Sequence, residues 1–314
     1  MTVRQLHQEF DTTQLKDATL LHFEGVDGYD VYNTTPPFQW QEKTWIFGRV
    51  EKRDEWAAST TQLFEEVSPH HFRKVSNAMI YPLEDPFVAF IQDEIVLGGT
   101  MVYKVCGKVT EYHVNFYRGH DLLSLTYFTS GPRKMKDIRL IELANGKIGV
   151  FSRHRGTHIN QQHQTLAVIG YGEIDSLDQL NPDFIEQARL LPNLFGEGEW
   201  GGCNQLHLLD DGRIGVIGHH SWLEDQPLPR SLSVYVAISF IFDPQRWTVD
   251  DVRLIAQRNA YPDAPFKKPH VADCVFPSGF VVDPRTGTTL LYSGLGDCYE
   301  GVAIISNPFE PRDE

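Results

Sequence analysis

The chain has 314 residues, of which 41% are hydrophobic and 22% charged, a composition typical of a globular protein with a buried core. Its 28 basic and 42 acidic residues give a formal net charge of -14, which argues against nucleic acid or an anionic membrane as a partner. Four cysteines without a C-x-x-C pair argue against a disulfide framework. Met1 to Leu6 contain no apolar signal region and no apolar run approaches ~20 residues, so we expect a cytoplasmic protein.

In chain order, residues 1–22 show little periodicity and are expected to form a lead-in strand or arm. From Tyr29 onward, short runs rich in β-formers predict strands, the clearest of them at 44–48, 95–98, 147–151, 213–218 and 289–293. The segment from Leu177 to Leu190 is the one good candidate for a short helix or a loop between repeats. Since no linker rich in Pro, Gly or Ser separates these runs, we expect a single domain over 1–314.

A repeat is visible in the strands that precede these runs. Asn145-Gly146, Asp211-Gly212 and Thr286-Gly287 are hairpin turn signals, because glycine accepts the positive φ of a tight turn. The strand before each turn opens on a carboxylate or amide, at Asp30, Asp85, Asp137, Asn204 and Asp273. The intervals of 55, 52, 67 and 69 residues leave room for about four short strands per unit, which predicts an all-β fold, a five-bladed β-propeller. A β-sandwich or two all-β domains are the alternatives.

The first strand of every propeller blade lines the central channel, so these five residues are expected to meet near the axis. Four carboxylates at close quarters cannot all ionise cheaply, so the pKa of at least one should be raised. Such a group can donate a proton near neutrality, as glycosyl transfer requires of a general acid. Asp85, preceded by Glu84, is the candidate; in an arbitrary β protein, Asp85-Pro86 is more often only a turn.

The ends of the second strands carry cationic and hydrogen-bonding groups that suit a phosphate. These are Arg49 with Glu51, Arg153 with His154, His219 with His220, and Tyr292, while Lys136 lies beside Asp137. The histidines have no zinc-type spacing with cysteine, so no metal site is predicted. No Walker-type or dinucleotide-binding glycine pattern is present, and no cofactor is expected.

Several motifs resemble those of known carbohydrate-active families. Glu84-Asp85-Pro86-Phe87-Val88 resembles the E-D-P-R-V motif of glycoside hydrolase family 130, the β-mannoside phosphorylases. The chain is more similar to the mannosyltransferase-phosphorylases of glycosyltransferase family 108, long known as a domain of unknown function. That similarity covers about Asp30 to Ile305 and rests on 48–51, 136–140, 202–208 and 292–297.

The resemblance implies a five-bladed propeller that transfers mannose with inversion in β-1,2-linked oligosaccharides, with mannose 1-phosphate as product or donor. By position, it implies Asp85 as general acid, which can act through a sugar hydroxyl. It also implies phosphate or donor contacts from Arg49, Lys136, Arg153, His219 and Tyr292, and sugar contacts from Asp30, Asp137, Asn204 and Asp273. Phe87 stands where family 130 usually has arginine, so a contact of that arginine is missing or supplied elsewhere.

Two other functions remain open from the sequence. One is a glycoside hydrolase that uses water instead of phosphate. The other is a non-catalytic propeller that binds glycans, because propellers host many functions. In the preferred interpretation the partners are an oligosaccharide and inorganic phosphate or mannose 1-phosphate, with phosphate as a co-substrate.

Overall fold

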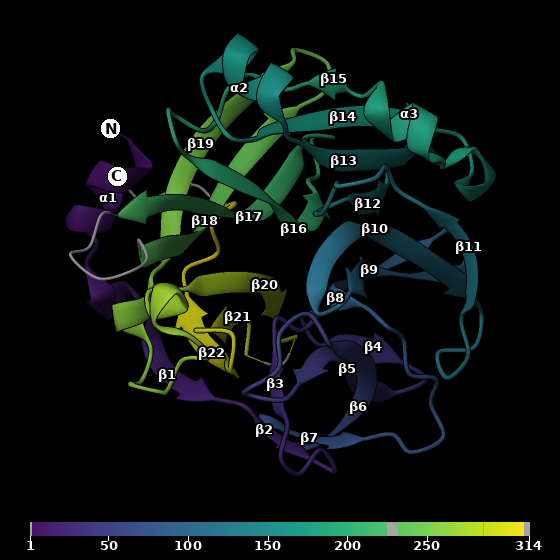
Figure 1. The fold of residues 1–314 in the computed structure, drawn as a ribbon, viewed down its shortest axis with the longest axis vertical. Helices are drawn as coiled ribbons and strands as arrows, with labels where there is room; N and C mark the ends of the chain where they lie inside the picture. Colours follow the sequence, from purple (N-terminus) through teal and green to yellow (C-terminus); the bar gives the residue numbers. More distant parts are fainter. Residues whose placement is uncertain (1, 225–231, 285, 311–314) are drawn as a thin grey trace.

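Five sheets are arranged in a ring around a central channel, and the fold is a five-bladed β-propeller (Figure 1). The computed structural model describes residues 2–224, 232–284 and 286–310. The predicted fold class is therefore confirmed. Neighbouring strands within each blade are antiparallel, apart from one added parallel pair in blade one.

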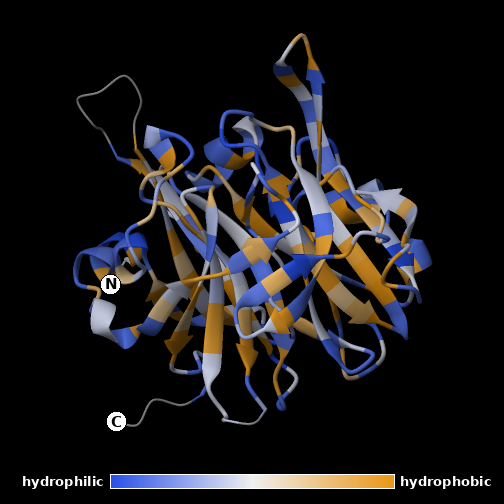
Figure 2. Ribbon diagram, turned by 90° about the horizontal axis from the view of Figure 1, so that it is seen from below, coloured by the Kyte–Doolittle hydropathy of each residue, from blue (hydrophilic) through white to orange (hydrophobic). Residues whose placement is uncertain are grey.

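The first two blades are formed by the strands between residues 22 and 130. Blade one has β3 (Asp30–Tyr32), β5 (Lys43–Glu51), β6 (Thr60–Ser68) and β7 (His71–Lys74), with β4 (Phe38–Trp40) beside β5 and β2 (His22–Glu24) parallel to β7. Blade two has β8 (Glu84–Ile91), β9 (Glu94–Val105), β10 (Lys108–Gly119) and β11 (Thr126–Ser130). The hairpin of β9 and β10 rises above the rim of the ring (Figure 2).

The remaining blades follow the same order from the channel outward. Blade three has β12 (Arg139–Glu142), β13 (Ile148–His154), β14 (Val168–Ile174) and β15 (Arg189–Leu190). Blade four has β16 (Trp200–Leu208), β17 (Ile214–Glu224), β18 (Leu232–Asp243) and β19 (Thr248–Ala256). Blade five has β20 (Val275–Val282), β21 (Thr289–Leu295), β22 (Tyr299–Ile305) and, as its outermost strand, β1 (Lys16–Leu20).

The N-terminal segment closes the ring. Its β1 pairs with β22, with Leu20 opposite Gly301, so the two ends of the chain share one sheet (Figure 1). Pairing β22 in this way covers an edge that would otherwise expose unpaired backbone groups. Ahead of β1 lie α1 (Val3–Gln8) and the 3-10 turn η1 (Thr12–Gln14). The expected lead-in strand is thus part of a blade.

Helices are few and short. Besides α1 and η1, the described residues form α2 (Thr157–His163), α3 (Pro182–Glu186) and the 3-10 turns η2 (Leu177–Gln179), η3 (Arg258–Ala260) and η4 (Pro269–Val271). The helix candidate at 177–190 divides into η2, α3 and β15, within blade three between its third and fourth strands. Pro182 at its start and the Asn181 side chain, which accepts from the backbone N–H of Phe184, fix where α3 begins. No helix among the described residues is long and apolar enough to cross a membrane.

The hairpin turns follow the sequence signals. Gly146, Gly212 and Gly287 have φ of 78°, 82° and 70°, a region that glycine enters without the steric cost of a Cβ. The alternating strands pack into five hydrophobic clusters, one between each pair of adjacent blades. Because each blade buries both faces against its neighbours, the ring holds its shape without a single central core.

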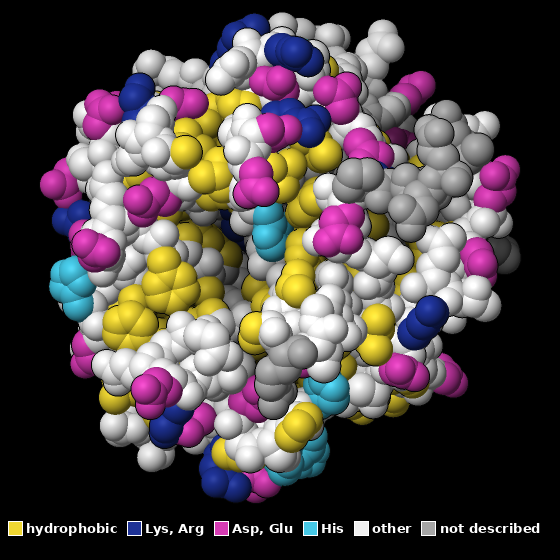
Figure 3. Space-filling model, turned by 180° about the vertical axis from the view of Figure 1, so that it is seen from behind, with side chains coloured by type: hydrophobic (Ala, Val, Ile, Leu, Met, Phe, Trp, Pro, Cys, Tyr) yellow, Lys and Arg dark blue, Asp and Glu magenta, His cyan; other side chains and the backbone are white. Residues whose placement is uncertain are grey.

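Polar and apolar surfaces divide at the two ends of the channel. A polar cavity of about 380 Å³ collects residues from the starts of the inner strands, such as Asp85 and Trp200, and from the ends of the second strands, such as Arg153. A groove of about 430 Å³ is lined by the ends of the inner strands, at 88–91, 140–142 and 204–208. On the face opposite to that of Figure 1, hydrophobic side chains flank a central hollow (Figure 3).

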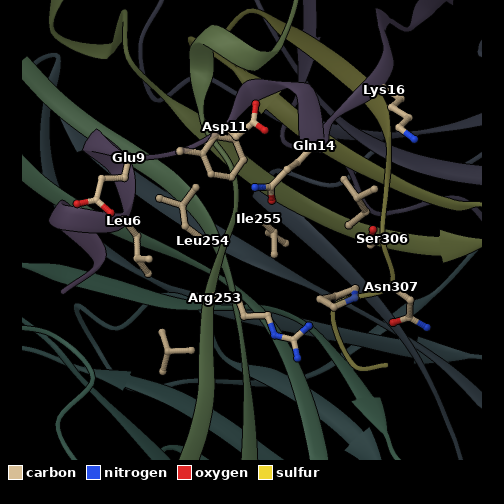
Figure 4. A pocket seen from close by; sticks show the side chains of 14 residues that line it. Leu6, Glu9, Asp11, Gln14, Lys16, Arg253, Leu254, Ile255, Ser306 and Asn307 are labelled. Carbon is tan, nitrogen blue, oxygen red and sulfur yellow. The ribbon is translucent and has the colours of Figure 1, made fainter. Parts of the chain in front are cut away.

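A third hollow lies outside the channel. The N-terminal segment, the end of β19 and the residues after β22 enclose a cleft of about 590 Å³ (Figure 4). Three of its charged side chains, Glu9, Asp11 and Lys16, come from the segment that precedes or opens β1. Arg253, on the opposite wall, forms an ion pair with Asp251.

Candidate active site

Four polar residues of the cavity share a backbone conformation that few side chains tolerate. Asn33, Asp85, Asp137 and Asp297 have φ of 46°, 48°, 54° and 55°, in the left-handed region. Asn and Asp enter this region more readily than other residues with a Cβ. The register of β8 against β9 also shifts between Glu84 and Phe87, which is a bulge around Asp85. Bulges and left-handed residues re-aim side chains, and they cluster at functional sites.

Asp85 is held by its neighbours through a single oxygen. Its Oδ1 accepts from Asn33 Nδ2 at 2.8 Å and from Arg49 Nη1 at 3.0 Å. Burial would raise the pKa of Asp85, but the charges of Arg49 and Lys136 outweigh it and lower the pKa to about 2. In this state Asp85 is a carboxylate, and its Oδ2 is not used by Asn33 or Arg49.

Arg49 is the centre of the ion-pair network below Asp85. Its Nη2 donates to Glu84 at 3.2 Å and to Glu51 at 3.4 Å. Glu84 also pairs with Lys136 at 2.9 Å. Glu51 accepts from Tyr32, and from Lys267 in the loop ahead of η4, 216 residues further along the chain. The network therefore joins blades one and two and the connection between blades four and five.

A second ionic group joins blades three and four. Asp137 Oδ2 lies 2.7 Å from Arg153 Nη1 and 3.6 Å from His219 Nε2. Nδ1 of His219 is 2.8 Å from the side-chain oxygen of Asn204. Burial lowers the pKa of His219 to about 3, so the ring is neutral. Burial would raise the pKa of Asp137, but the charge of Arg153 outweighs it and lowers the pKa.

Asp297 is the cavity carboxyl with a raised pKa. Burial raises its pKa to about 6, the Arg49 charge opposes this shift, and the Asp85 charge adds to it. The expectation of a carboxyl that holds a proton near neutrality is thus met in the cavity by Asp297 rather than by Asp85. The sequence pattern does not point to Asp297. This residue lies just beyond the end of β21, the second strand of blade five, and Arg153 and His154 lie at the corresponding end of β13, the second strand of blade three. The same rule of second-strand ends, applied with the right strand length, would have found it.

Four predicted site residues do not line the cavity: Asn204, which lines the groove at the other end of the channel, and Tyr292, Asp30 and Asp273. Tyr292 is in the middle of β21 and is buried in the hydrophobic cluster between blades five and one, because the strand ends only at Leu295. Asp30 starts β3 but pairs with Arg53, with one oxygen 2.7 Å from Nη2. Asp273 precedes β20, and its backbone oxygen accepts from Tyr235. The expected meeting of all five strand-opening residues is therefore wrong for Asp30 and Asp273.

Other residues occupy the expected places. In blade one, the cavity position belongs to Asn33, just after β3, and Asn33 stands 52 residues before Asp85, the interval that separates Asp85 from Asp137. In blade five, Cys274 and Phe276 line the cavity in place of Asp273. Asn204 is at a bulge in β16 and reaches the site through its hydrogen bond to His219.

The charges around the cavity are balanced. Among the described residues that line it, the cations are Arg49, Lys136, Arg153 and Arg155, and the carboxylates are Glu84, Asp85, Asp137 and Asp297. Protonation of Asp297 leaves a net positive cavity inside a protein whose formal charge is -14. Arg153 is 6% exposed, and its Nε has no hydrogen-bond partner in the described part of the chain. A buried donor of this kind is available to an anion.

Phe87 fills a gap between blades two and three. It is buried, a side chain on Gly98 would collide with its ring, and the Arg139 guanidinium lies 4.9 Å from its centroid. Arg139 donates to the backbone oxygens of Asn204 and Ile138. Phe87 and Arg139 line the apolar groove. The buried guanidinium of Arg139, from blade three, thus lies over the ring of Phe87.

A possible metal-ligating group lies on outer strands of blade one. Within residues 2–224, 232–284 and 286–310, the one group of three suitable ligands is His22, Glu24 and His71, on β2 and β7. His71 Nε2 is already 2.8 Å from a Glu24 oxygen. Arg73 holds the other oxygen of Glu24 at 2.7 Å. None of these residues lines the polar cavity.

Comparison with models of known protein families shows which family the chain belongs to. The model of the family described as protein of unknown function (DUF1861) matches residues 7–311. The chain belongs to the DUF1861 family. The comparison with curated proteins gave no match.

The chain is also similar to several proteins of solved structure. A mannose phosphorylase from Leishmania mexicana, MPT-4, in complex with phosphate is 42% identical, with a TM-score of 0.90 over 98% of this chain and 93% of the other. A GDP-Man-dependent mannosyltransferase from the same organism, MPT-1, is 42% identical, with a TM-score of 0.91 over 99% and 97%. A Parabacteroides distasonis protein described as a putative glycoside hydrolase shares the fold at 17% identity and a TM-score of 0.61 over 89% and 87%.

Proposed function

We propose that this protein is an inverting β-1,2-mannoside phosphorylase. It transfers a mannosyl group between the end of a β-1,2-linked oligosaccharide and inorganic phosphate, and in the reverse direction it extends the chain from mannose 1-phosphate. The resemblance of several motifs to those of glycosyltransferase family 108 and glycoside hydrolase family 130 supports this assignment. The 42% identity to a mannose phosphorylase supports it further.

One observation carries the proposal: a single cavity combines Asp85 with a set of cations. A phosphorylase needs a proton donor for the leaving sugar and a site for phosphate beside it. Asp85 serves as the donor, and Arg153, with its unpartnered Nε, serves phosphate together with Lys136 and Arg49. Guanidinium groups suit phosphate because their N–H groups match its oxygens in pairs. Asp137 and Glu84, which line the cavity, offer acceptors to sugar hydroxyls, and Asn204 supports the site through its hydrogen bond to His219.

The reaction balances with these groups alone. A phosphate oxygen attacks the anomeric carbon of the terminal mannose, and the bond from that carbon to the leaving sugar oxygen breaks. The electron pair of this bond stays on the leaving oxygen, which takes the proton of Asp85 directly or through a sugar hydroxyl. Attack from the opposite face inverts the configuration, so a β-mannoside gives α-mannose 1-phosphate.

Phosphate binding also prepares the acid. In the empty site Arg49 and Lys136 hold the pKa of Asp85 at about 2, against the effect of burial. A phosphate dianion beside these cations offsets their charge and repels a carboxylate, and both effects raise the pKa of a nearby acid. Asp85 therefore becomes a better proton donor when the co-substrate is in place.

The test is to incubate the protein with β-1,2-mannobiose and phosphate and to follow mannose 1-phosphate. We expect release from the unmodified protein and none from Asp85→Asn. Arg153→Met should raise the KM for phosphate more than the KM for mannobiose. Arg189→Met, which removes an arginine that lies over Trp247 outside the cavity, is the control. Turnover that survives Asp85→Asn would contradict the role of Asp85.

A second function is favoured by one comparison. The GDP-Man-dependent relative is as similar in sequence as the mannose phosphorylase. The same assay with GDP-mannose as donor and mannobiose as acceptor separates the two, because a transferase would elongate the sugar without phosphate. Sugar release that needs neither phosphate nor nucleotide would point to the hydrolase instead. Binding without any turnover would point to a glycan-binding propeller.

A further inference from the structure

One wall of the polar cavity extends from the ionic floor up to the rim of the propeller. Trp56, between β5 and β6, lines the cavity together with Val102, Val109 and Tyr112 of the β9–β10 hairpin. This hairpin stands above the body of the propeller (Figure 2). We name these four residues the aromatic wall. It offers apolar and aromatic surface beside a cavity whose floor is ionic.

Trp56 is exposed but anchored. Its relative exposure is 61%, unusual for the residue type that buries the most apolar area. Its backbone oxygen accepts from the Lys104 ammonium on the hairpin. Two residues later the backbone N–H of Ala58 donates to Glu51 at 2.7 Å. The backbone that carries the ring is therefore held at the mouth on both sides of Trp56, and an exposed apolar surface on an anchored backbone indicates a ligand site.

The aromatic wall lies next to the ionic residues at the cavity floor. The Lys136 ammonium lies 5.5 Å from the ring centroid of Tyr112 and pairs with Glu84, the neighbour of Asp85. The facing aromatics offer less free surface: Trp200 is 8% exposed and donates to the hydroxyl of Tyr235. A chain that leaves the cavity floor therefore meets free aromatic faces on the side of the aromatic wall.

We propose that the aromatic wall binds the sugar units beyond the bond that is cleaved, so that the protein selects linear mannosides of three or more units over the disaccharide. A pyranose ring presents an apolar C–H face that packs on an aromatic ring, while its hydroxyl groups stay in water. The identity of the sugar rests on the proposed function. The existence of an extended site rests on the geometry of Trp56 and Tyr112.

The test measures binding without catalysis. Calorimetry in phosphate-free buffer compares β-1,2-mannobiose with the tetraose for the unmodified protein, Trp56→Ala, Trp56→Phe and Tyr103→Ala. We expect the unmodified protein to bind the tetraose about tenfold tighter, since stacking contributes on this scale. Trp56→Ala should remove most of this ratio, and Trp56→Phe should keep part of it. Tyr103 is exposed on the same hairpin but does not line the cavity, so Tyr103→Ala should keep the ratio.

The outcomes separate this inference from the proposed function. Equal affinity for both lengths, a ratio that survives Trp56→Ala, or no binding of any mannoside would overturn the aromatic wall as a sugar site. A length preference lost in Trp56→Ala, without release of mannose 1-phosphate in the presence of phosphate, would support the wall and contradict phosphorolysis. Release of mannose 1-phosphate without a length preference would support phosphorolysis and contradict the aromatic wall. Because Trp56 lies outside the hydrophobic clusters, its replacement leaves the core intact.

Discussion

Arg49 Nη1 lies 3.0 Å from Asp85 Oδ1 and thereby joins blade one to the catalytic candidate in blade two. The same guanidinium contacts Glu84 and Glu51, so one buried cation serves three carboxylates. Arg49 thus has two physical roles. It stabilises the channel, and it sets the ionisation of the residue proposed to protonate the leaving sugar.

Replacement of Arg49 should reveal both roles. Arg49→Met leaves three carboxylates without their common cation, and breaking a buried pair typically costs about 3–5 kcal/mol. Arg49→Lys keeps the charge but loses the fork of donors, so its stability should lie between those of the unmodified protein and Arg49→Met. Urea unfolding at pH 7 measures the stability, and a pH profile of turnover should move to higher pH in Arg49→Met as the pKa of Asp85 rises. Stability equal to that of the unmodified protein would contradict this network.

Asp297 should make stability depend on pH in a definite direction. Burial raises its pKa from 3.8 in the unfolded chain to about 6 in the fold, so the folded state favours the protonated form. The resulting stability is complete below about pH 3.8 and is lost as pH rises through about 6. The difference in unfolding free energy between the unmodified protein and Asp297→Asn should fall by roughly 1–3 kcal/mol between pH 4 and 7.

Glu300 provides the matched comparison for Asp297. Burial raises the pKa of its carboxyl to about 8, against the hydrogen bonds from Ser278 and Thr34. Its contribution to stability should therefore persist to higher pH than that of Asp297 before it is lost. If the Asp297→Asn and Glu300→Gln differences are both flat from pH 4 to 9, the raised pKa values are wrong.

The Lys267–Glu51 pair should matter more than a surface pair of the same type. Both side chains are buried, and Glu51 also accepts from Tyr32 and Arg49. Lys267→Met leaves Glu51 with less compensation and should lower the unfolding free energy by about 3–5 kcal/mol. Lys43→Met breaks a pair with Glu65 at 2.7 Å whose lysine is 55% exposed, and it should change stability by less than about 1 kcal/mol. Equal effects of the two variants in urea unfolding would contradict this ranking.

Introducing the arginine of family 130 at Phe87 should be harmful here. Phe87→Arg places a second guanidinium in the buried position under Arg139, whose own pKa burial already lowers. An uncompensated buried charge should cost about 3 kcal/mol or more. Phe87→Leu keeps the position apolar and should cost less than about 2 kcal/mol. Thermal and urea unfolding of the two variants distinguish charge from size. A Phe87→Arg protein as stable as Phe87→Leu would show that the position accepts the arginine.

Much of the fold could be predicted because its signals are local. Positive φ at a turn, alternation along a strand and regular spacing of units are properties of short segments, and Gly146, Gly212 and Gly287 take the conformations expected of them. The spacing of these units led to the five-bladed ring. Arg49 and Arg153 line the cavity because the ends of second strands in a propeller point to its channel, and Lys136 lines it beside Asp137.

The errors came from positions that a short segment does not determine. Asp30 and Asp273 open repeats as Asp85 does, but the cavity position falls at Asn33 in one blade and at Cys274 and Phe276 in the other. The sequence pattern places a strand end at Tyr292, but the strand ends at Leu295, and the cavity residue is Asp297. A shift of one residue turns a side chain to the other face of a strand, and bulges introduce such shifts.

The sequence by itself determined the ring and the places of Asp85 and Asp137 at its channel, because propensity, turn signals and the spacing of repeats are properties of residues close together in the chain. The tertiary structure alone decided the ionisation of the site. Asp85 is kept charged by Arg49 and Lys136, and Asp297 is kept protonated to about pH 6 by burial. These pKa values depend on which charges from distant blades approach within a few ångströms, and no local pattern specifies that distance.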